Sequence, residues 1–197
     1  LPPSHFIVIN GFLTGEGGVK MSKSFGNVTN PYDLVRDYGT DAVRLFFLKD
    51  VSLFEDSSFT IERFKDSYNS NLANGLGNLV SRTMTLSEKY LEKAPEIPGW
   101  DDMLGYFDAL ERYDIKESVD KIWNEIAELD KFIQEVEPFK VIKIDEKKGK
   151  ELISDIVLRL FTIARRLRPV LPATSIAIKN LIRENKKPAK PLFPRKD

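Results

Sequence analysis

The sequence predicts a mainly helical protein in which a small α/β segment, residues 1–55, precedes a bundle of helices within residues 56–197. Near the start of the chain, residues 6–9 form a short β-branched run that is typical of a buried strand. From Thr60 onward, apolar residues instead recur every three or four positions, as they do in amphipathic helices. The polar segment 55–58 separates the two patterns and marks the predicted domain boundary.

Composition and charge limit the classes of protein to which this chain can belong. With 42% hydrophobic residues among 197, the chain can bury a core, and its charged residues cancel to a formal net charge of zero. The charges are unevenly placed: residues 85–137 hold fifteen Asp and Glu against six Lys and Arg, whereas residues 156–183 carry six Lys and Arg and no acid. An RNA partner would therefore prefer the second region.

Some classes of site are disfavoured by the composition. The absence of cysteine excludes a disulfide framework and a thiolate zinc site, and it fits a reducing compartment. We interpret the single histidine, His5, as structural and expect no metal site. No apolar run approaches the roughly 20 residues of a membrane span, and no targeting signal is recognisable. We therefore expect a cytoplasmic protein without a membrane partner.

The predicted strand at residues 6–9 is apolar throughout, as expected for a strand buried on both faces of a parallel sheet. Because the sequence offers no second run that could complete such a sheet, we expect the chain to be the C-terminal portion of something larger. A glycine-rich turn at residues 15–18 then reverses the chain, as a hairpin, into the polar loop that follows.

Two short helices are predicted next. Asn30 is suited to the N-cap and Pro31 to the first position of a helix that should stop at Gly39. Thr40 and Asp41 are expected to cap the second helix, which is densely apolar and hence buried on most sides.

A long amphipathic helix is predicted from Thr60 to about residue 86, although Gly75 and Gly77 weaken it by about 1 kcal/mol each relative to alanine. The glycines therefore suggest close packing or close backbone approach. On this helix four polar residues share one flank of the apolar stripe: Asn71, Asn74, Asn78 and Arg82. Any one of these residues alone is most simply interpreted as part of a solvated helix flank. Together, however, the four side chains could also recognise the hydrogen-bonding edge of a ligand.

The remaining elements are also predicted as helices. A weakly patterned one covers residues 100–110, and a capping box at residues 114–117 opens a long helix that Pro138 ends. A third long helix is expected over residues 150–168 and a fourth over 174–183, followed by a basic, proline-containing tail.

The loop at residues 18–28 carries the most specific chemical signal. Lysine ammonium groups, serine hydroxyls and a nearby glycine suit the oxygens of a polyphosphate, although a solvated hairpin tip has a similar composition. The string Lys20-Met21-Ser22-Lys23-Ser24 matches the signature loop of class I aminoacyl-tRNA synthetases. This resemblance implies that these five residues bind ATP, that Lys23 is the main catalytic contact to the pyrophosphate, and that Lys20 supports it.

Further motifs make the whole chain resemble the methionyl-tRNA synthetases. They are Tyr68-Asn69, Asn71-Leu72-Ala73-Asn74, residues 76–82, Phe132-Ile133-Gln134-Glu135 with Pro138, residues 11–14, residues 168–172 and residues 192–195. The resemblance implies the C-terminal edge of a Rossmann-type catalytic domain, residues 1–55, followed by a helical-bundle anticodon-binding domain, residues 56–197.

The same resemblance implies the ligands. ATP with Mg²⁺, methionine and tRNA(Met) are the expected substrates and partners of a methionine–tRNA ligase. The residues expected at the anticodon are Asn78, Arg82, Pro138 and Phe139. Phe139 stands where the family commonly has tryptophan, and Asp130 stands where it commonly has asparagine, so the indole N–H and the amide donor are lost.

The family's His-x-Gly-His signature is absent from the sequence. We therefore expect the chain to lack the nucleotide-binding half, with its amino-acid pocket, and to be inactive alone. Two alternatives stay open at this point: a non-catalytic tRNA-binding module that retains the loop, and another class I synthetase such as the leucyl enzyme.

Overall fold

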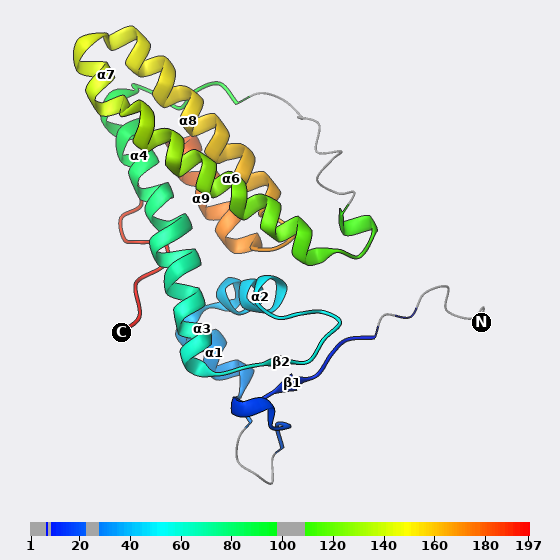
Figure 1. Ribbon diagram of the computed structural model, residues 1–197. Helices are drawn as coiled ribbons and strands as arrows, with labels where there is room; N and C mark the ends of the chain where they lie inside the picture. Colours follow the sequence, from blue (N-terminus) through cyan, green and yellow to red (C-terminus); the bar gives the residue numbers. More distant parts are fainter. Residues whose placement is uncertain (1–6, 8, 23–27, 98–108) are drawn as a thin grey trace.

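The computed structural model describes residues 7, 9–22, 28–97 and 109–197, and in these residues the chain is mainly helical with one small sheet (Figure 1). The elements are β1 (Leu13–Thr14), the 3-10 turn η1 (Glu16–Gly18), α1 (Pro31–Tyr38), α2 (Thr40–Lys49), β2 (Ser57–Ser58), α3 (Ile61–Ser67), the π-helical η3 (Tyr68–Gly77), α4 (Asn78–Tyr90), α6 (Ile115–Val136), α7 (Pro138–Ile144), α8 (Glu146–Arg166) and α9 (Pro172–Glu184). No helix in this part of the chain is long and apolar enough to cross a membrane.

The predicted strand at residues 6–9 is wrong where the structure describes it. Ile7 and Ile9 are 81% and 78% exposed and belong to no strand, while Phe6 and Val8 lie outside the described residues. No described strand lies beside this run, so Ile7 and Ile9 are not covered by a neighbouring strand. The sheet forms instead between β1 and β2, which pair in parallel with Leu13 opposite Ser57.

The turn after β1 is confirmed as a hairpin. Thr14 and Lys20 form an antiparallel bridge, and the Gly15 N–H donates to the Val19 carbonyl over 2.7 Å. Gly17 and Gly18 have φ values of 66° and 77°, a backbone conformation that favours glycine. The hairpin thus delivers the chain to the polar loop.

The capping of α1 is confirmed, whereas that of α2 is not as predicted. The Asn30 side chain accepts a hydrogen bond from the Tyr32 N–H, and α1 ends at Gly39, whose φ is 88°. The N-cap of α2 is Gly39 itself, and neither Thr40 nor Asp41 caps the helix with its side chain. Asp41 is instead 7% exposed and accepts two hydrogen bonds of 2.7 Å from Thr174, one from the backbone and one from the hydroxyl.

The long helix predicted from Thr60 is present, but its middle is π-helical. Residues 61–90 form one continuous helical path through α3, η3 and α4. In η3, an added Cβ at Gly77 would lie 2.8 Å from the Leu72 carbonyl oxygen and 3.6 Å from the Phe193 ring. Gly77 is therefore needed for close approach, as its position in a helix suggested.

The later helices follow the prediction with three differences. The Asp114 carboxylate accepts from the Glu117 N–H, but the Glu117 side chain pairs with Lys121 and Arg112 and does not complete a capping box. Pro138 does end α6, yet it also starts an unpredicted short helix, α7. The third and fourth long helices begin earlier than expected, at Glu146 and Pro172. Of the weak helix predicted at residues 100–110, residues 100–108 lie outside the described residues, and residues 109 and 110 are helical as predicted.

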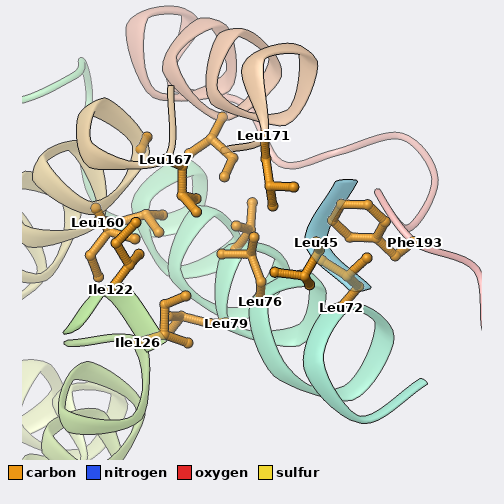
Figure 2. Close-up of a cluster of buried hydrophobic side chains, with 14 of the residues drawn as sticks. Leu45, Leu72, Leu76, Leu79, Ile122, Ile126, Leu160, Leu167, Leu171 and Phe193 are labelled. Atoms are coloured by element: carbon orange, nitrogen blue, oxygen red, sulfur yellow. The ribbon is translucent and has the colours of Figure 1, made fainter. Parts of the chain in front are cut away.

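One apolar core joins these elements. In Figure 1, α4, α6 and α8 lie side by side with α7 at one end, and α1, α2 and α3 lie at the other. Side chains from α2, η3, α4, α6, α8, the turn after α8 and the C-terminal segment meet in the close-up of Figure 2: Leu45, Leu72, Leu76, Leu79, Ile122, Ile126, Leu160, Leu167, Leu171 and Phe193. The core therefore includes residues on both sides of the predicted boundary.

Replacing Asp41 by alanine is expected to destabilise the whole protein. The change removes a buried acceptor from two Thr174 donors, and hydrogen bonds to charged groups contribute about 1.5–3 kcal/mol each. With two such bonds lost, we expect the free energy of unfolding to fall by at least about 3 kcal/mol in urea titrations. As a control, Asp66→Ala at an exposed position of α3 should change it by less than about 0.5 kcal/mol. Equal stability of the two variants would contradict this role of Asp41.

Candidate functional site

The first candidate site is the polar loop, of which the structure describes the beginning and the end. Lys20 is exposed at the last bridge of the hairpin, whereas Met21 and Ser22 are half-buried. Met21 packs against the hydrophobic core. Lys23 and Ser24 lie outside the described residues. Met21 therefore anchors the loop, and the candidate ATP-binding role of these five residues stays a prediction.

The far end of the loop is held by α1. The Asn30 cap fixes the start of this helix two residues after Val28, and Leu34 is buried in the core. The hairpin and the helix cap thus fix both ends of a segment rich in Lys and Ser, and Lys20 is exposed at the first of these ends.

The second candidate site is a pocket that joins two residues far apart in the sequence. Arg82 of α4 and Phe139 of α7 both line an open pocket of about 360 Å³. The full lining is Ser81, Arg82, Thr85, Leu86, Ile133 and Phe139. Phe139 is 40% exposed, so part of its ring is available to another planar group. The structure therefore brings these two candidate residues, Arg82 and Phe139, to one pocket.

The other two predicted anticodon residues do not line this pocket. Asn78 is exposed on α4 one turn before Arg82. Pro138 is buried at the first position of α7, and Glu137 before it has a left-handed backbone with φ of 42°. Pro138 thus acts on the pocket indirectly, because this sharp corner and the start of α7 place Phe139 beside α4. Of the other asparagines on the predicted flank, Asn71 is half-buried and donates to Ser67.

A carboxylate sits at the edge of the pocket. The Arg82 guanidinium donates to Asp130 Oδ1 over 2.6 Å, and Gln134 Nε2 donates to Asp130 Oδ2 over 2.5 Å. The Arg82 and Asp130 side chains are 42% and 36% exposed, so their ion pair contributes at most about 1 kcal/mol to stability. Asp130 orients Arg82 at little energetic cost, and a ligand can compete for the guanidinium.

Sequence reasoning missed the floor of the pocket. Leu86 and Ile133 supply apolar surface, and the Thr85 hydroxyl is held by the Ser81 carbonyl at 2.7 Å. Thr85 and Leu86 follow Arg82 by three and four residues, so helical periodicity could have indicated them. Chemically, an exposed ring, an apolar floor and a guanidinium can hold one planar base and bind its edge.

No cluster of three or more His, Asp or Glu side chains suited to a metal ion occurs among the described residues.

Comparison with known proteins identifies relatives of the chain. A family model described as tRNA synthetases class I (M) matches residues 2–84. Methionine–tRNA ligase of Clostridium acetobutylicum is 34% identical over 194 residues, which cover 91% of this chain and 30% of that protein. Methionine–tRNA ligase of Thermotoga maritima is 31% identical over 205 residues, covering 96% of this chain and 32% of that protein. The chain therefore spans about 30% of the length of these curated relatives.

A solved structure shares the fold. The structure of Mycobacterium tuberculosis methionyl-tRNA synthetase in complex with methionyl-adenylate aligns with a TM-score of 0.74 and 24% identity, covering 94% of this chain and 43% of that one. At this identity the likeness concerns the fold, which is mainly helical with a small sheet.

Gly77→Ala is expected to disturb the π-helical turn that leads into α4 and the pocket. Its Cβ would collide with the Leu72 carbonyl, and overpacking of this kind costs about 1–3 kcal/mol of unfolding free energy. Thermal and urea unfolding measure the loss. Ser70→Ala, at an exposed position of the same π-helical segment, is the control and should be nearly neutral. A fully stable Gly77→Ala protein would show that this close approach is dispensable.

Proposed function

Because the chain is a relative of the methionine–tRNA ligases along about nine tenths of its own length, we propose that it supplies the ATP-loop and anticodon-binding parts of such a ligase. In this proposal it acts in the cytoplasm together with a nucleotide-binding half of the kind that the resemblance to class I synthetases implies. The observation that carries the proposal is the pocket in which Arg82 and Phe139 come together from α4 and α7.

The proposed domains divide the chain near residue 55. Residues 1–55 are assigned to the C-terminal edge of a Rossmann-type catalytic domain and residues 56–197 to a helical anticodon-binding bundle. The division is supported by the change from the hairpin and sheet to the long helices, of which α8 packs against α4, α6 and α9. The sheet pairing of β1 with β2 and the shared core would make the two parts one firmly connected body.

In the proposed reaction the loop acts on ATP, which carries Mg²⁺ as usual for nucleotide substrates. Attack by the methionine carboxylate on the α-phosphorus forms the adenylate and releases pyrophosphate, on which negative charge develops. The Lys20 and Lys23 ammonium groups stabilise that charge, while the serine hydroxyls of Ser22 and Ser24 donate to phosphate oxygens and Met21 fixes the loop. Positioning and charge stabilisation are thus the contributions of this chain.

At the second site the proposed ligand is a base of the tRNA(Met) anticodon. An unstacked loop base would lie against the Phe139 ring, with Leu86 and Ile133 beneath it. Arg82 would then bind the edge of the base or an adjacent phosphate after leaving Asp130, and Asn78 would read a neighbouring edge. Pro138 keeps the ring in place.

Lys23→Ala in the complete enzyme is expected to slow adenylate formation while leaving methionine binding nearly unchanged. By analogy with loss of an oxyanion donor, the barrier should rise by about 2.7–4 kcal/mol, a 10²–10³-fold slower rate. Pre-steady-state pyrophosphate exchange measures this rate, and Lys20→Ala should have a smaller effect. An unchanged rate constant together with intact tRNA binding would leave a non-catalytic tRNA-binding module as the better description.

Phe139→Ala is expected to weaken binding of a stem-loop with a CAU anticodon by about one to two powers of ten, because base stacking contributes ~1–3 kcal/mol. Fluorescence titration of the chain at fixed salt measures the affinity. Phe139→Trp should bind equally well or better, since it keeps a stacking face and adds an indole N–H donor.

Ile144→Ala is the matched control for Phe139→Ala. Ile144 is also a large apolar side chain of α7 and is 89% exposed, but it does not line the pocket. Its replacement should leave binding unchanged. If the wild-type chain bound CAU and altered anticodons with equal affinity, the pocket would have no role in anticodon recognition.

A further inference from the structure

A cluster of positive charges lies away from both candidate sites, where α8 ends and α9 packs against it. It consists of Arg165, Arg168, Lys179 and Arg183, which we call the basic cluster. Arg165 and Arg168 are three residues apart, Lys179 and Arg183 are one helical turn apart, and the turn at residues 167–171, which contains Arg168, joins the two helices. The cluster lies within the stretch 156–183, which contains no acid.

The members of the basic cluster repel one another. Burial, followed by the positive charges of Arg168, Arg183 and Arg165, lowers the pKa of the Lys179 ammonium below its usual value. Helix C-termini favour cations, which accounts for Arg165 in the last turn of α8 and Arg183 in the last turn of α9. Lys179 lies in the middle of α9 and gains nothing from that effect. Lys179 is thus held beside three positive charges without the support of a helix C-terminus.

Several other cations of this protein are neutralised by nearby carboxylates. Arg159 and Arg166, in the same acid-free stretch, pair with Asp155 and Glu125, and on α6 the lysines 116, 121 and 131 pair with carboxylates of the same helix. Arg168, Lys179 and Arg183 form no ion pair with any residue that the structure describes. These three cations are therefore available to an external anion.

We propose that the basic cluster binds the phosphate backbone of RNA, outside the anticodon pocket and without reading sequence. The choice of RNA as the partner rests on the proposed function, in which the chain binds a tRNA. Three of the four cations are arginines, whose planar guanidinium matches the oxygens of a phosphate. An acidic protein fits less well, because a protein interface needs an apolar centre and Ile176 is the only exposed large apolar side chain on α8 and α9.

The test compares two charge-matched triple variants of this chain. Arg168→Gln, Lys179→Gln and Arg183→Gln remove three cations of the basic cluster. Lys116→Gln, Lys121→Gln and Lys131→Gln remove three cations of α6 that are already paired with carboxylates. Circular dichroism confirms folding, and a third variant, Arg168→Lys with Arg183→Lys, keeps the charge. The probes are two tRNA(Met) transcripts, with a CAU and an altered anticodon, each titrated at several salt concentrations.

The basic-cluster variant should bind both transcripts about 10- to 100-fold more weakly at 0.2 M salt. Its plot of log affinity against log salt should flatten by about 0.9 for each phosphate that the protein no longer neutralises, while the ratio between the two anticodons stays constant. The α6 variant and the Arg-to-Lys variant should keep the wild-type slope. Unchanged affinity and slope in the basic-cluster variant would overturn the proposal, and binding of an acidic protein to the cluster in that case would identify the other class of partner.

Failure of the proposed function gives a different result from failure of the basic-cluster proposal. If the wild-type chain does not prefer the CAU transcript, the anticodon assignment fails, whereas a salt slope that depends on the basic cluster still supports a phosphate-binding surface.

Discussion

The attachment of α2 to the turn between α8 and α9 is the interaction on which the rest of the structure depends. Helix α9 begins with Pro172 after Leu171 and has no capping side chain of its own, so its first N–H groups need an acceptor from elsewhere. Asp41 supplies it from α2, where the negative charge also meets the positive end of the α9 dipole. Three residues on, Arg44 donates to the carbonyls of Pro169 and Val170 over 2.7 and 2.8 Å. Helix α2 thus binds both a backbone N–H group at the start of α9 and backbone carbonyl groups of the turn before it.

This attachment explains how the polar loop and the pocket can belong to one body. Helix α2 directly follows α1, whose cap holds the end of the loop, and Lys49 at its far end pairs with Asp120 of α6. From the sheet, the helical path through α3, η3 and α4 runs along the core to Arg82. Figure 1 shows these elements meeting at the end of the long helices opposite α7. A ligand at either site therefore acts on a scaffold with one continuous core.

The sequence could predict the features that local interactions determine. Asn30 and Asp114 cap helices within three residues of themselves, and the apolar stripes of the long helices follow from their period. Composition drew attention to the loop and helical periodicity to Arg82, but the specific role of the loop and the choice of Phe139 rested on resemblance to a family. What could not be predicted depends on distant partners: Asp41 has the local pattern of a cap but binds Thr174, and the run at residues 6–9 has the composition of a strand without a described neighbour. The π-helical turn likewise could not be predicted, although the close approach of Gly77 to the Leu72 carbonyl shows why a glycine stands there.

The ion pair of Arg82 with Asp130 determines which ligands the pocket favours, because a ligand that binds Arg82 must replace Asp130 as its acceptor. Asp130 holds Arg82 with one oxygen and Gln134 with the other, so both donors are already satisfied in the free protein. A ligand that offers only apolar surface would leave this pair intact and gain the stacking energy alone. A base edge or phosphate, by contrast, can replace the carboxylate as acceptor, and an exposed pair worth at most about 1 kcal/mol does not prevent the exchange. Because stacking contributes ~1–3 kcal/mol, a ligand that both stacks and accepts gains more than it displaces. The carboxylate thus favours ligands that combine a planar face with an acceptor, which is the chemistry of a nucleotide.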